Sequence, residues 1–449
     1  MHDLLLRAGA PLSGALDVPG DKSISHRAVL LALLADGPCR ATGWLDCADT
    51  RSSLAAALAL GASAAFEHGV LTLTPPPAPP RDDLVLDCGN SGTTARLLLG
   101  LLAAWLKPGG PAVTLDGDAS LRTRPMARVV EPLRRMGADL SWAGNEGRLP
   151  VTVRGAPMRG CTHDLAVASA QVKSALLLAG LGATGITTVR GAAGSRDHTE
   201  RMLRGMGASS SEPCGSPSVS GPRRLPAFTL AVPGDPSSAA FFQAAAAIIP
   251  GSDVTVRGQS LNPTRTGALA VLQHAGALVD LVVQDAAGEV AADAGEPTGS
   301  VRVRGRSRIA FAIERPQVPA LVDEIPVLAV LATQCAGRST ISGAAELRVK
   351  ESDRLALLAR NLRRLGAAVA ERDDGLVIDG PCVLRGGTRD EPLVLETAGD
   401  HRIAMAMAVA ALITEGETAL DDGACVAVSF PGFHEVMECL LGPGAQRRP

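Results

Sequence analysis

Polar clusters and apolar runs alternate along this chain in a regular order. Residues 22–27 (Lys-Ser-Ile-Ser-His-Arg) precede an apolar run, and similar short polar segments precede later runs rich in alanine and leucine. The pattern predicts helices that are polar at their N-terminal ends and apolar along most of their length. Six such helix starts occur, at Ser23, Ser91, Ser169, Ser237, Asp323 and His401, and successive starts lie 68 to 86 residues apart. This spacing predicts one supersecondary unit that is used six times.

A second series of residues runs in phase with the first. Five Gly-Ala pairs each close an amphipathic stretch and precede a strand-like run, at residues 61–62, 137–138, 207–208, 276–277 and 366–367. Glycine is the residue expected just after the end of a helix. Each unit is therefore predicted to contain strands and two helices.

A repeated tetrapeptide divides the chain. Val-Pro-Gly-Asp occurs at residues 18–21 and again at 232–235. Three units lie between these points and three follow, so we predict two domains with hinges near both tetrapeptides: residues 21–235, and residues 1–20 together with 236–449. Two unrelated Pro-Gly turns would produce the same tetrapeptides, and this alternative stays open.

Composition narrows the class of protein. With 449 residues, 46% of them hydrophobic, and a mean hydropathy of +0.18, the chain can form two cores. Its apolar runs are shorter than the roughly 18 residues that span a bilayer, and no charged-then-apolar signal pattern opens it, so we expect a cytoplasmic protein without a membrane partner. A net charge of -3, ten aromatic residues and no tyrosine argue against nucleic acid as a partner.

The cysteines and histidines give no sign of a metal site. Nine cysteines occur singly, and none has the two-residue spacing of a zinc or redox motif. The eight histidines form no helical metal-binding pair. We therefore expect no metal and no cofactor.

Charged residues cluster at or near the helix starts. The candidate cations are Lys22, Arg27, Arg124, Lys350, Arg354 and Arg402, and the candidate carboxylates are Asp323 and Glu351. Pro125 is predicted in the first turn of a helix over 126–136, and Lys350 and Arg354 on one helical face. Taken singly, each cluster could be a helix cap, by Ser23 or Ser25, or a solvated face. Together they predict a cationic cleft for a substrate with several negative charges, with two carboxylates for proton transfer.

The motifs resemble those of the 5-enolpyruvylshikimate-3-phosphate synthase family over essentially the whole chain. The matching segments are residues 21–27 (Asp-Lys-Ser-Ile-Ser-His-Arg), 89–93, 124–125, 169–171, 195–199 (Ser-Arg-Asp-His-Thr), 323–326, 348–354 (Arg-Val-Lys-Glu-Ser-Asp-Arg) and 400–402. The resemblance implies a two-domain inside-out α/β barrel, with three βαβαββ-type repeats in each domain, that closes on substrate. It implies transfer of the enolpyruvyl group of phosphoenolpyruvate to the 5-hydroxyl of shikimate 3-phosphate through a tetrahedral intermediate. We expect a monomer.

The resemblance also assigns ligand residues. Shikimate 3-phosphate would bind Lys22, Ser23, Arg27, Ser169, Ala170, Gln171, Ser195, Asp323 and Lys350. Phosphoenolpyruvate would bind Lys22, Gly92, Arg124, Gln171, Arg354 and Arg402. Asp323 would be the base on the hydroxyl, Glu351 the proton donor to C3, and Lys22 the group that stabilises the departing phosphate.

Three positions distinguish this chain from some family members. Val428 stands where some carry a lysine, and Ala170 stands where they have serine. Gly92 leaves room that bulkier members fill, so we expect glyphosate to enter the phosphoenolpyruvate pocket.

Two other functions remain as alternatives. The sister transferase that acts on UDP-N-acetylglucosamine has Lys-Asn in place of Lys22-Ser23 and a reactive cysteine in the loop aligned with 117–124, where this chain has none. A sensor of phosphorylated metabolites would have no need for Asp323 and Glu351 in a cationic cleft.

Overall fold

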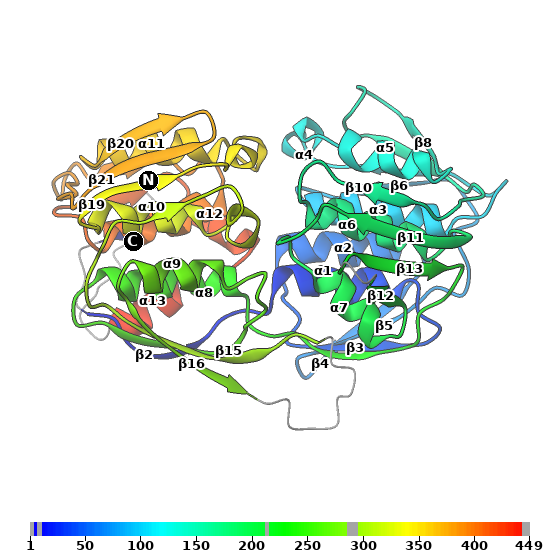
Figure 1. The fold of residues 1–449 in the computed structure, drawn as a ribbon, viewed down its shortest axis with the longest axis horizontal. Helices are drawn as coiled ribbons and strands as arrows, with labels where there is room; N and C mark the ends of the chain where they lie inside the picture. The colour runs from blue at the N-terminus through cyan, green and yellow to red at the C-terminus, as the bar shows by residue number, and fades with distance from the viewer. Residues whose placement is uncertain (1–3, 7–10, 212–214, 285–294, 442–449) are drawn as a thin grey trace. The chain divides into compact units, whose positions relative to one another are not determined.

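The computed structural model describes residues 4–6, 11–211, 215–284 and 295–441 (Figure 1). It separates into two compact units. Unit 2 contains residues 20–233 with Gly295 and Glu296, and unit 1 contains the other described residues. Glu296 lies in unit 2, where its carboxylate is 2.6 Å from His198 Nδ1.

Sheets of one design recur in both units. In unit 2 the strand orders are β14-β3-β5-β4, β6-β7-β9-β8 and β10-β11-β13-β12, and in unit 1 they are β2-β15-β17-β16, β18-β19-β21-β20 and the three-stranded β22-β23-β1. The first two strands of each sheet are parallel, as in the register Leu84↔Val113 of β6 and β7, and the remaining pairs are antiparallel. A parallel pair needs a crossover, and a buried helix supplies it in most of these sheets.

The strands have the following bounds. Those of unit 2 are β3 (Cys39–Thr42), β4 (Ser63–Glu67), β5 (Val70–Thr74), β6 (Leu84–Asp87), β7 (Val113–Asp116), β8 (Asp139–Trp142), β9 (Val151–Arg154), β10 (Thr162–Asp164), β11 (Gly185–Arg190), β12 (Ser209–Ser211), β13 (Pro217–Gly221) and β14 (Thr229–Ala231). Those of unit 1 are β1 (Leu4–Leu6), β2 (Ser13–Asp17), β15 (Asp253–Ser260), β16 (Leu278–Gln284), β17 (Thr298–Arg304), β18 (Ala312–Ile313), β19 (Gly337–Ile341), β20 (Ala368–Arg372), β21 (Gly375–Gly380), β22 (Leu393–Leu395) and β23 (Thr418–Leu420).

The helices follow the predicted pattern. They are α1 (Lys22–Ala32), α2 (Ala48–Ala59), α3 (Gly92–Trp105), α4 (Ala119–Thr123), α5 (Ala127–Arg135), α6 (Ala170–Gly180) and α7 (His198–Gly205) in unit 2, and α8 (Pro236–Ile248), α9 (Gly267–His274), α10 (Ile325–Gln334), α11 (Arg354–Arg364), α12 (His401–Ala411) and α13 (Phe433–Leu441) in unit 1. Three 3-10 turns, η1 (Val318–Ala320), η2 (Ala345–Val349) and η3 (Ala424–Val428), also lie in unit 1. The six predicted helix starts are confirmed to within two residues, as the first residues of α1, α3, α6, α8, α10 and α12.

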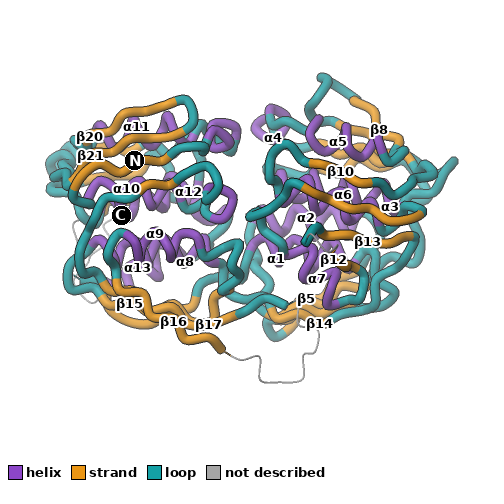
Figure 2. Tube along the Cα trace, viewed as in Figure 1, coloured by secondary structure: helices purple, strands orange, loops and turns teal. Residues whose placement is uncertain are grey.

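These six helices form the interior of the two units. Nearly every residue of α1, α3, α6, α8, α10 and α12 is buried, because beyond their polar N-terminal ends these helices are apolar on all faces. Figure 2 shows helices through the middle of each unit and strands along its margins. Each unit has its own hydrophobic core. Among the described residues, no helix has the length and hydrophobicity needed to cross a lipid bilayer.

The five Gly-Ala pairs end helices α2, α5, α7, α9 and α11, as predicted. The glycine has φ between +66° and +96° in every case, a left-handed conformation that favours glycine. The alanine N–H then binds the carbonyl five residues earlier, as in Ala62 N to Ala57 O at 3.1 Å. This is the Schellman arrangement, and it turns the chain from each amphipathic helix into the next strand.

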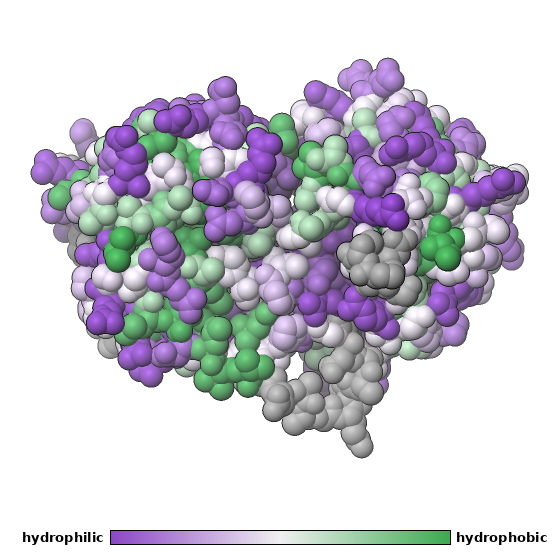
Figure 3. Space-filling model, viewed as in Figure 1, coloured by the Kyte–Doolittle hydropathy of each residue, from purple (hydrophilic) through white to green (hydrophobic). Residues whose placement is uncertain are grey.

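Some apolar side chains are exposed on unit 1. Val282 and Val283 of β16, the edge strand of its sheet, are each 63% exposed. Hydrophobic atoms gather at the lower edge of the molecule in Figure 3, where Figure 1 shows β16. The apolar character of this chain is therefore not confined to its two cores.

Four phenylalanines form the aromatic centre of the unit 1 core. The ring of Phe433 lies 6.0, 5.4 and 5.6 Å from those of Phe241, Phe242 and Phe430. We expect Phe433→Ala to lower the free energy of unfolding of unit 1 by about 3–5 kcal/mol, measured by denaturant titration, because it leaves a cavity. Phe66→Ala is the control, since Phe66 is 55% exposed; equal losses in the two variants would contradict this account of the core.

Candidate active site

The predicted ligand residues of unit 2 lie at the N-terminal ends of three buried helices. Lys22, Gly92 and Ala170 are the first residues of α1, α3 and α6, which pack side by side. Asp21, Ser91 and Ser169 cap these helices by accepting backbone N–H groups. The cap of α1 is thus Asp21, and the alternative in which Ser23 or Ser25 caps it is wrong.

Lys22 has an acidic partner. Its Nζ lies 2.7 Å from Asp49 Oδ2, near the start of α2, and both side chains are mostly buried. The carboxylate fixes the direction of the ammonium group at the mouth of α1.

Arg27 is buried, which excludes the solvated alternative. Its guanidinium donates to Thr199 Oγ1 at 2.6 Å, to Ser174 Oγ at 2.8 Å and to the Ser23 carbonyl at 2.8 Å. Burial lowers the pKa of Arg27 to about 10, although the Glu200 carboxylate, followed by that of Asp21, acts in the opposite direction. Arg27 therefore stays charged at neutral pH and connects α1 to α6 and α7.

A buried arginine that the sequence analysis missed connects α3 to α6. Arg96 Nη1 donates to Gln171 Oε1 at 2.6 Å, and Gln171 Nε2 donates to Thr93 Oγ1 at 3.0 Å. A Cβ atom on Gly92 would lie 2.8 Å from Arg96 Nη1. Glycine at position 92 therefore allows the guanidinium to remain over the first turn of α3.

Arg124 also lies near the start of α3, but it is positioned by α4 and not by the helix predicted over 126–136. The expected helix over 126–136 is α5, which begins at Ala127, so Pro125 precedes it; Arg124 is instead the C-cap of α4. Its Nη2 donates to Asn90 Oδ1 and, at 3.3 Å, to Ser120 Oγ. The side chain is thereby directed toward the residues that precede α3.

The loop before α7 supplies the last predicted residue of unit 2. Ser195 is buried and its hydroxyl donates to the Ala192 carbonyl at 2.7 Å. The adjacent Arg196 donates to Ser23 Oγ at 3.4 Å. This loop is therefore tied to the mouth of α1.

Arg354 is the centre of the predicted site in unit 1. Its side chain is 1% exposed, and it donates to Asp400 Oδ2 at 2.8 Å, Glu351 Oε2 at 2.6 Å and Asp323 Oδ1 at 3.3 Å. Burial alone would lower the pKa of Arg354, but the three carboxylates raise it above its ordinary value. Both carboxylates proposed for proton transfer thus share one guanidinium.

Asp400 organises the start of α12 in the same cluster. Besides binding Arg354, it accepts the backbone N–H of Arg402 at 2.9 Å and the Ser352 hydroxyl at 2.9 Å. Arg402 is buried at this helix start. One carboxylate therefore contacts the two arginines of unit 1 that are predicted to bind phosphoenolpyruvate, Arg354 through its guanidinium and Arg402 through its backbone N–H.

The predicted shared helical face of Lys350 and Arg354 is wrong. Lys350 follows η2, and α11 begins only at Arg354, because Asp353 caps that helix. Lys350 Nζ lies 3.6 Å from Glu346 Oε1. Val428, where some family members have lysine, is the last residue of η3.

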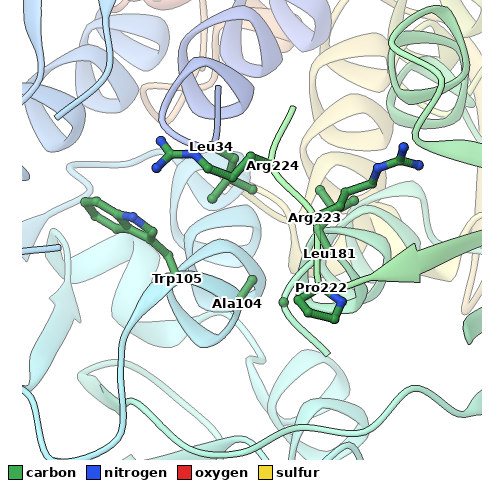
Figure 4. Close-up of a pocket in the computed structure, with 8 residues that line it drawn as sticks. Leu34, Ala104, Trp105, Leu181, Pro222, Arg223 and Arg224 are labelled. Carbon is green, nitrogen blue, oxygen red and sulfur yellow. The ribbon is translucent and has the colours of Figure 1, made fainter. Parts of the chain in front are cut away.

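A cavity of about 390 Å³ in unit 2 is separate from these residues. Figure 4 shows its lining, which includes Leu34, Trp105, Leu181 and Arg224. These residues lie at the C-terminal ends of α1, α3 and α6 or in the loop after β13. At 1.5 Å per residue, Leu34, Trp105 and Leu181 lie roughly 15–20 Å along the helices from the ends that carry the residues predicted to bind substrate.

The sequence matches the family described as EPSP synthase (3-phosphoshikimate 1-carboxyvinyltransferase) over residues 6–437. The chain belongs to this family. A curated 3-phosphoshikimate 1-carboxyvinyltransferase from Anaeromyxobacter sp. (strain K) is 50% identical, covering 98% of this chain and 97% of the relative. A relative of the same name from Acidithiobacillus ferrooxidans is 45% identical, covering 96% of both chains. A solved EPSP synthase from Acinetobacter baumannii is 36% identical, with a TM-score of 0.82 over 99% of this chain and 98% of that one.

Membership of the EPSP synthase family confirms the family and the enzyme class predicted from the sequence. The mixed α/β fold is confirmed as well. The roles of individual residues remain predictions. Asp49, Arg96 and Asp400 contact residues predicted to bind substrate, but these contacts were not predicted. The sequence carried two signals: Arg96 lies inside the apolar run that follows Gly92, and Asp400 belongs to the segment 400–402 that matches the family.

A buried histidine in α1 gives a prediction for stability. Burial lowers the pKa of His26 to about 3, and its Nδ1 lies 2.8 Å from Ser53 Oγ. The unfolded chain, with a histidine pKa of 6.5, binds this proton first, so the folded state loses stability as pH falls below 6.5. We expect His26 to contribute about 2 kcal/mol of this loss between pH 6.5 and 5.

Denaturant unfolding across this pH range checks the prediction. In His26→Gln, the slope of the unfolding free energy against pH should fall by the amount that corresponds to the uptake of about one proton on unfolding. The exposed His274→Gln should leave this slope unchanged. An unaltered slope in His26→Gln would mean that His26 is protonated in the folded state.

Proposed function

We propose that this protein transfers the enolpyruvyl group of phosphoenolpyruvate to the 5-hydroxyl of shikimate 3-phosphate and releases phosphate, in the shikimate pathway. Family membership and relatives named 3-phosphoshikimate 1-carboxyvinyltransferase at 45–50% identity support this reaction. The observation that carries it is the binding of Arg354 to both Asp323 and Glu351, because it collects the two carboxylates that addition and elimination require.

The ligand residues of unit 2 are proposed to bind anionic groups. Helix N-termini with nearby Lys22, Arg27 and Arg124 favour phosphate and carboxylate. The proposed residues for shikimate 3-phosphate in this unit are Lys22, Ser23, Arg27, Ser169, Ala170, Gln171 and Ser195, with Ala170 using its backbone. Those for phosphoenolpyruvate are Lys22, Gly92, Arg124 and Gln171.

The residues of unit 1 are proposed to perform the proton transfers. Asp323 accepts the proton of the 5-hydroxyl while Glu351 protonates C3 of phosphoenolpyruvate, which gives the tetrahedral intermediate. This intermediate then loses phosphate beside Lys22 and returns a C3 proton to the Glu351 carboxylate, which restores the double bond of the enolpyruvyl group. Arg354 and Arg402 bind the phosphoenolpyruvate, and Asp323 and Lys350 bind the acceptor. The shared guanidinium fixes the orientation of both carboxylates, which favours proton transfer over short distances.

Finer features of the fold belong to the same proposal. The recurring sheet order and the buried helices support an inside-out α/β barrel of three βαβαββ-type repeats in each domain. The hinges near 18–21 and 232–235, the cationic cleft, the monomeric state and the cytoplasmic location remain predictions.

The proposed entry of glyphosate into the phosphoenolpyruvate pocket is supported by Gly92. Glycine has no Cβ atom, which would lie 2.8 Å from Arg96 Nη1 and 3.5 Å from Arg124 Nη1.

Phosphate release tests the reaction. Purified protein with phosphoenolpyruvate should release phosphate with shikimate 3-phosphate, and should not do so with UDP-N-acetylglucosamine or without an acceptor. Release with the sugar nucleotide would favour the sister transferase, and binding without release would favour the sensor.

Removing one carboxylate tests the proposed base. Asp323→Ala should lower kcat by about 10²–10⁴-fold, the usual contribution of a positioned base, while KM changes by only a few-fold. Asp379→Ala is a matched control because it also removes an arginine-bound aspartate, in the exposed pair with Arg338. Near-normal turnover in Asp323→Ala would remove this assignment.

A further inference from the structure

A buried ion pair connects α6 to α7 next to the residues of unit 2 that are proposed to bind phosphate. Lys173 Nζ lies 2.5 Å from Glu200 Oε1, and the two side chains are 4% and 6% exposed. Lys173 belongs to the first turns of α6 and Glu200 to the first turn of α7. The reaction proposed above uses neither residue.

Lys173 joins two segments that are proposed to bind the acceptor. Its backbone N–H binds the Ser169 carbonyl at 3.0 Å, and its ammonium group donates to the Ser195 carbonyl at 3.3 Å. The Lys173 side chain therefore links the loop that carries Ser195 to the start of α6, which Ser169 caps.

Glu200 acts on the buried arginine of the same group. Thr199, which precedes Glu200, and Ser174, which follows Lys173, bind the Arg27 guanidinium and each other at 2.6 to 2.8 Å. The Glu200 carboxylate is the strongest of the charges that favour the protonated form of Arg27, against the effect of burial. Without the Glu200 carboxylate, Lys173 and Arg27 would be two buried positive charges with less negative charge nearby to balance them.

Stability alone is a weak explanation for such a pair. Burying two charges costs solvation energy, and an apolar pair of similar volume often gives equal or greater stability. The location of this pair, between Arg27 and Ser195, points to a role in binding.

We propose that Lys173 and Glu200 are positioning residues for the phosphate group of the acceptor substrate. Glu200 compensates the charge of Lys173 and Arg27, and Lys173 fixes the carbonyl of Ser195. The phosphate then meets a charged guanidinium and a serine that are already in place. This inference rests on the function proposed above, because it takes shikimate 3-phosphate as the acceptor.

The test measures binding of shikimate 3-phosphate by calorimetry, together with both KM values and the melting temperature. We expect Glu200→Gln to raise the Kd of shikimate 3-phosphate about tenfold, a loss of about 1.4 kcal/mol in binding free energy, because the charges of Lys173 and Arg27 lose a compensating carboxylate. The KM of phosphoenolpyruvate should change less than about twofold. Asp253→Asn, which loses the exposed ion pair with Arg302, should change neither constant.

A double variant keeps the test decisive if a single change prevents folding. Lys173→Met with Glu200→Met removes both charges together and should fold, yet should still bind shikimate 3-phosphate about tenfold more weakly. A Kd within twofold of the unsubstituted protein in either variant would overturn the proposal, as would an equal rise of both KM values that follows the melting temperature. Failure of the unsubstituted protein to release phosphate would instead overturn the proposed function, and this inference with it.

Discussion

A buried helix must satisfy the N–H groups of its first turn, and this requirement governs how the chain is built. Six apolar helices lie in the interior of the two units, and five of them begin after an aspartate or serine whose side chain accepts a backbone N–H. Polar residues therefore concentrate where these helices begin. The same ends carry the residues proposed to bind substrate, so one set of positions serves both folding and chemistry.

The two units solve the problem of buried charge in different ways. In unit 1 the single guanidinium of Arg354 is surrounded by three carboxylates, which gives a locally acidic cluster next to Arg402. In unit 2 the buried cations Arg27 and Lys173 share the nearby carboxylate of Glu200. An excess of positive charge suits binding of a phosphate, and an excess of carboxylate suits proton transfer.

The helix starts and the Gly-Ala helix ends could be predicted because each depends on neighbours within a few residues. The links between helices could not. Arg96 binds Gln171 across 75 residues, and Arg354 binds Asp400 across 46. Local errors arose where a short turn intervened: Arg124 closes α4 instead of opening α5, and Lys350 follows η2 instead of belonging to α11. Helix α5 begins one residue after its predicted start, and α11 begins only after the cap Asp353; periodicity alone does not resolve differences of this size.

In the part of the chain that the structure describes, the first and last strands in sequence meet in one sheet, where Leu4 of β1 lies opposite Leu420 of β23. Unit 2, by contrast, is almost entirely one continuous stretch, residues 20–233. During synthesis on the ribosome, nearly all of unit 2 is available while the second half of the chain is still being made. The sheet that contains β1 cannot close until translation is almost complete, so its N-terminal strand must wait through more than four hundred residues of elongation.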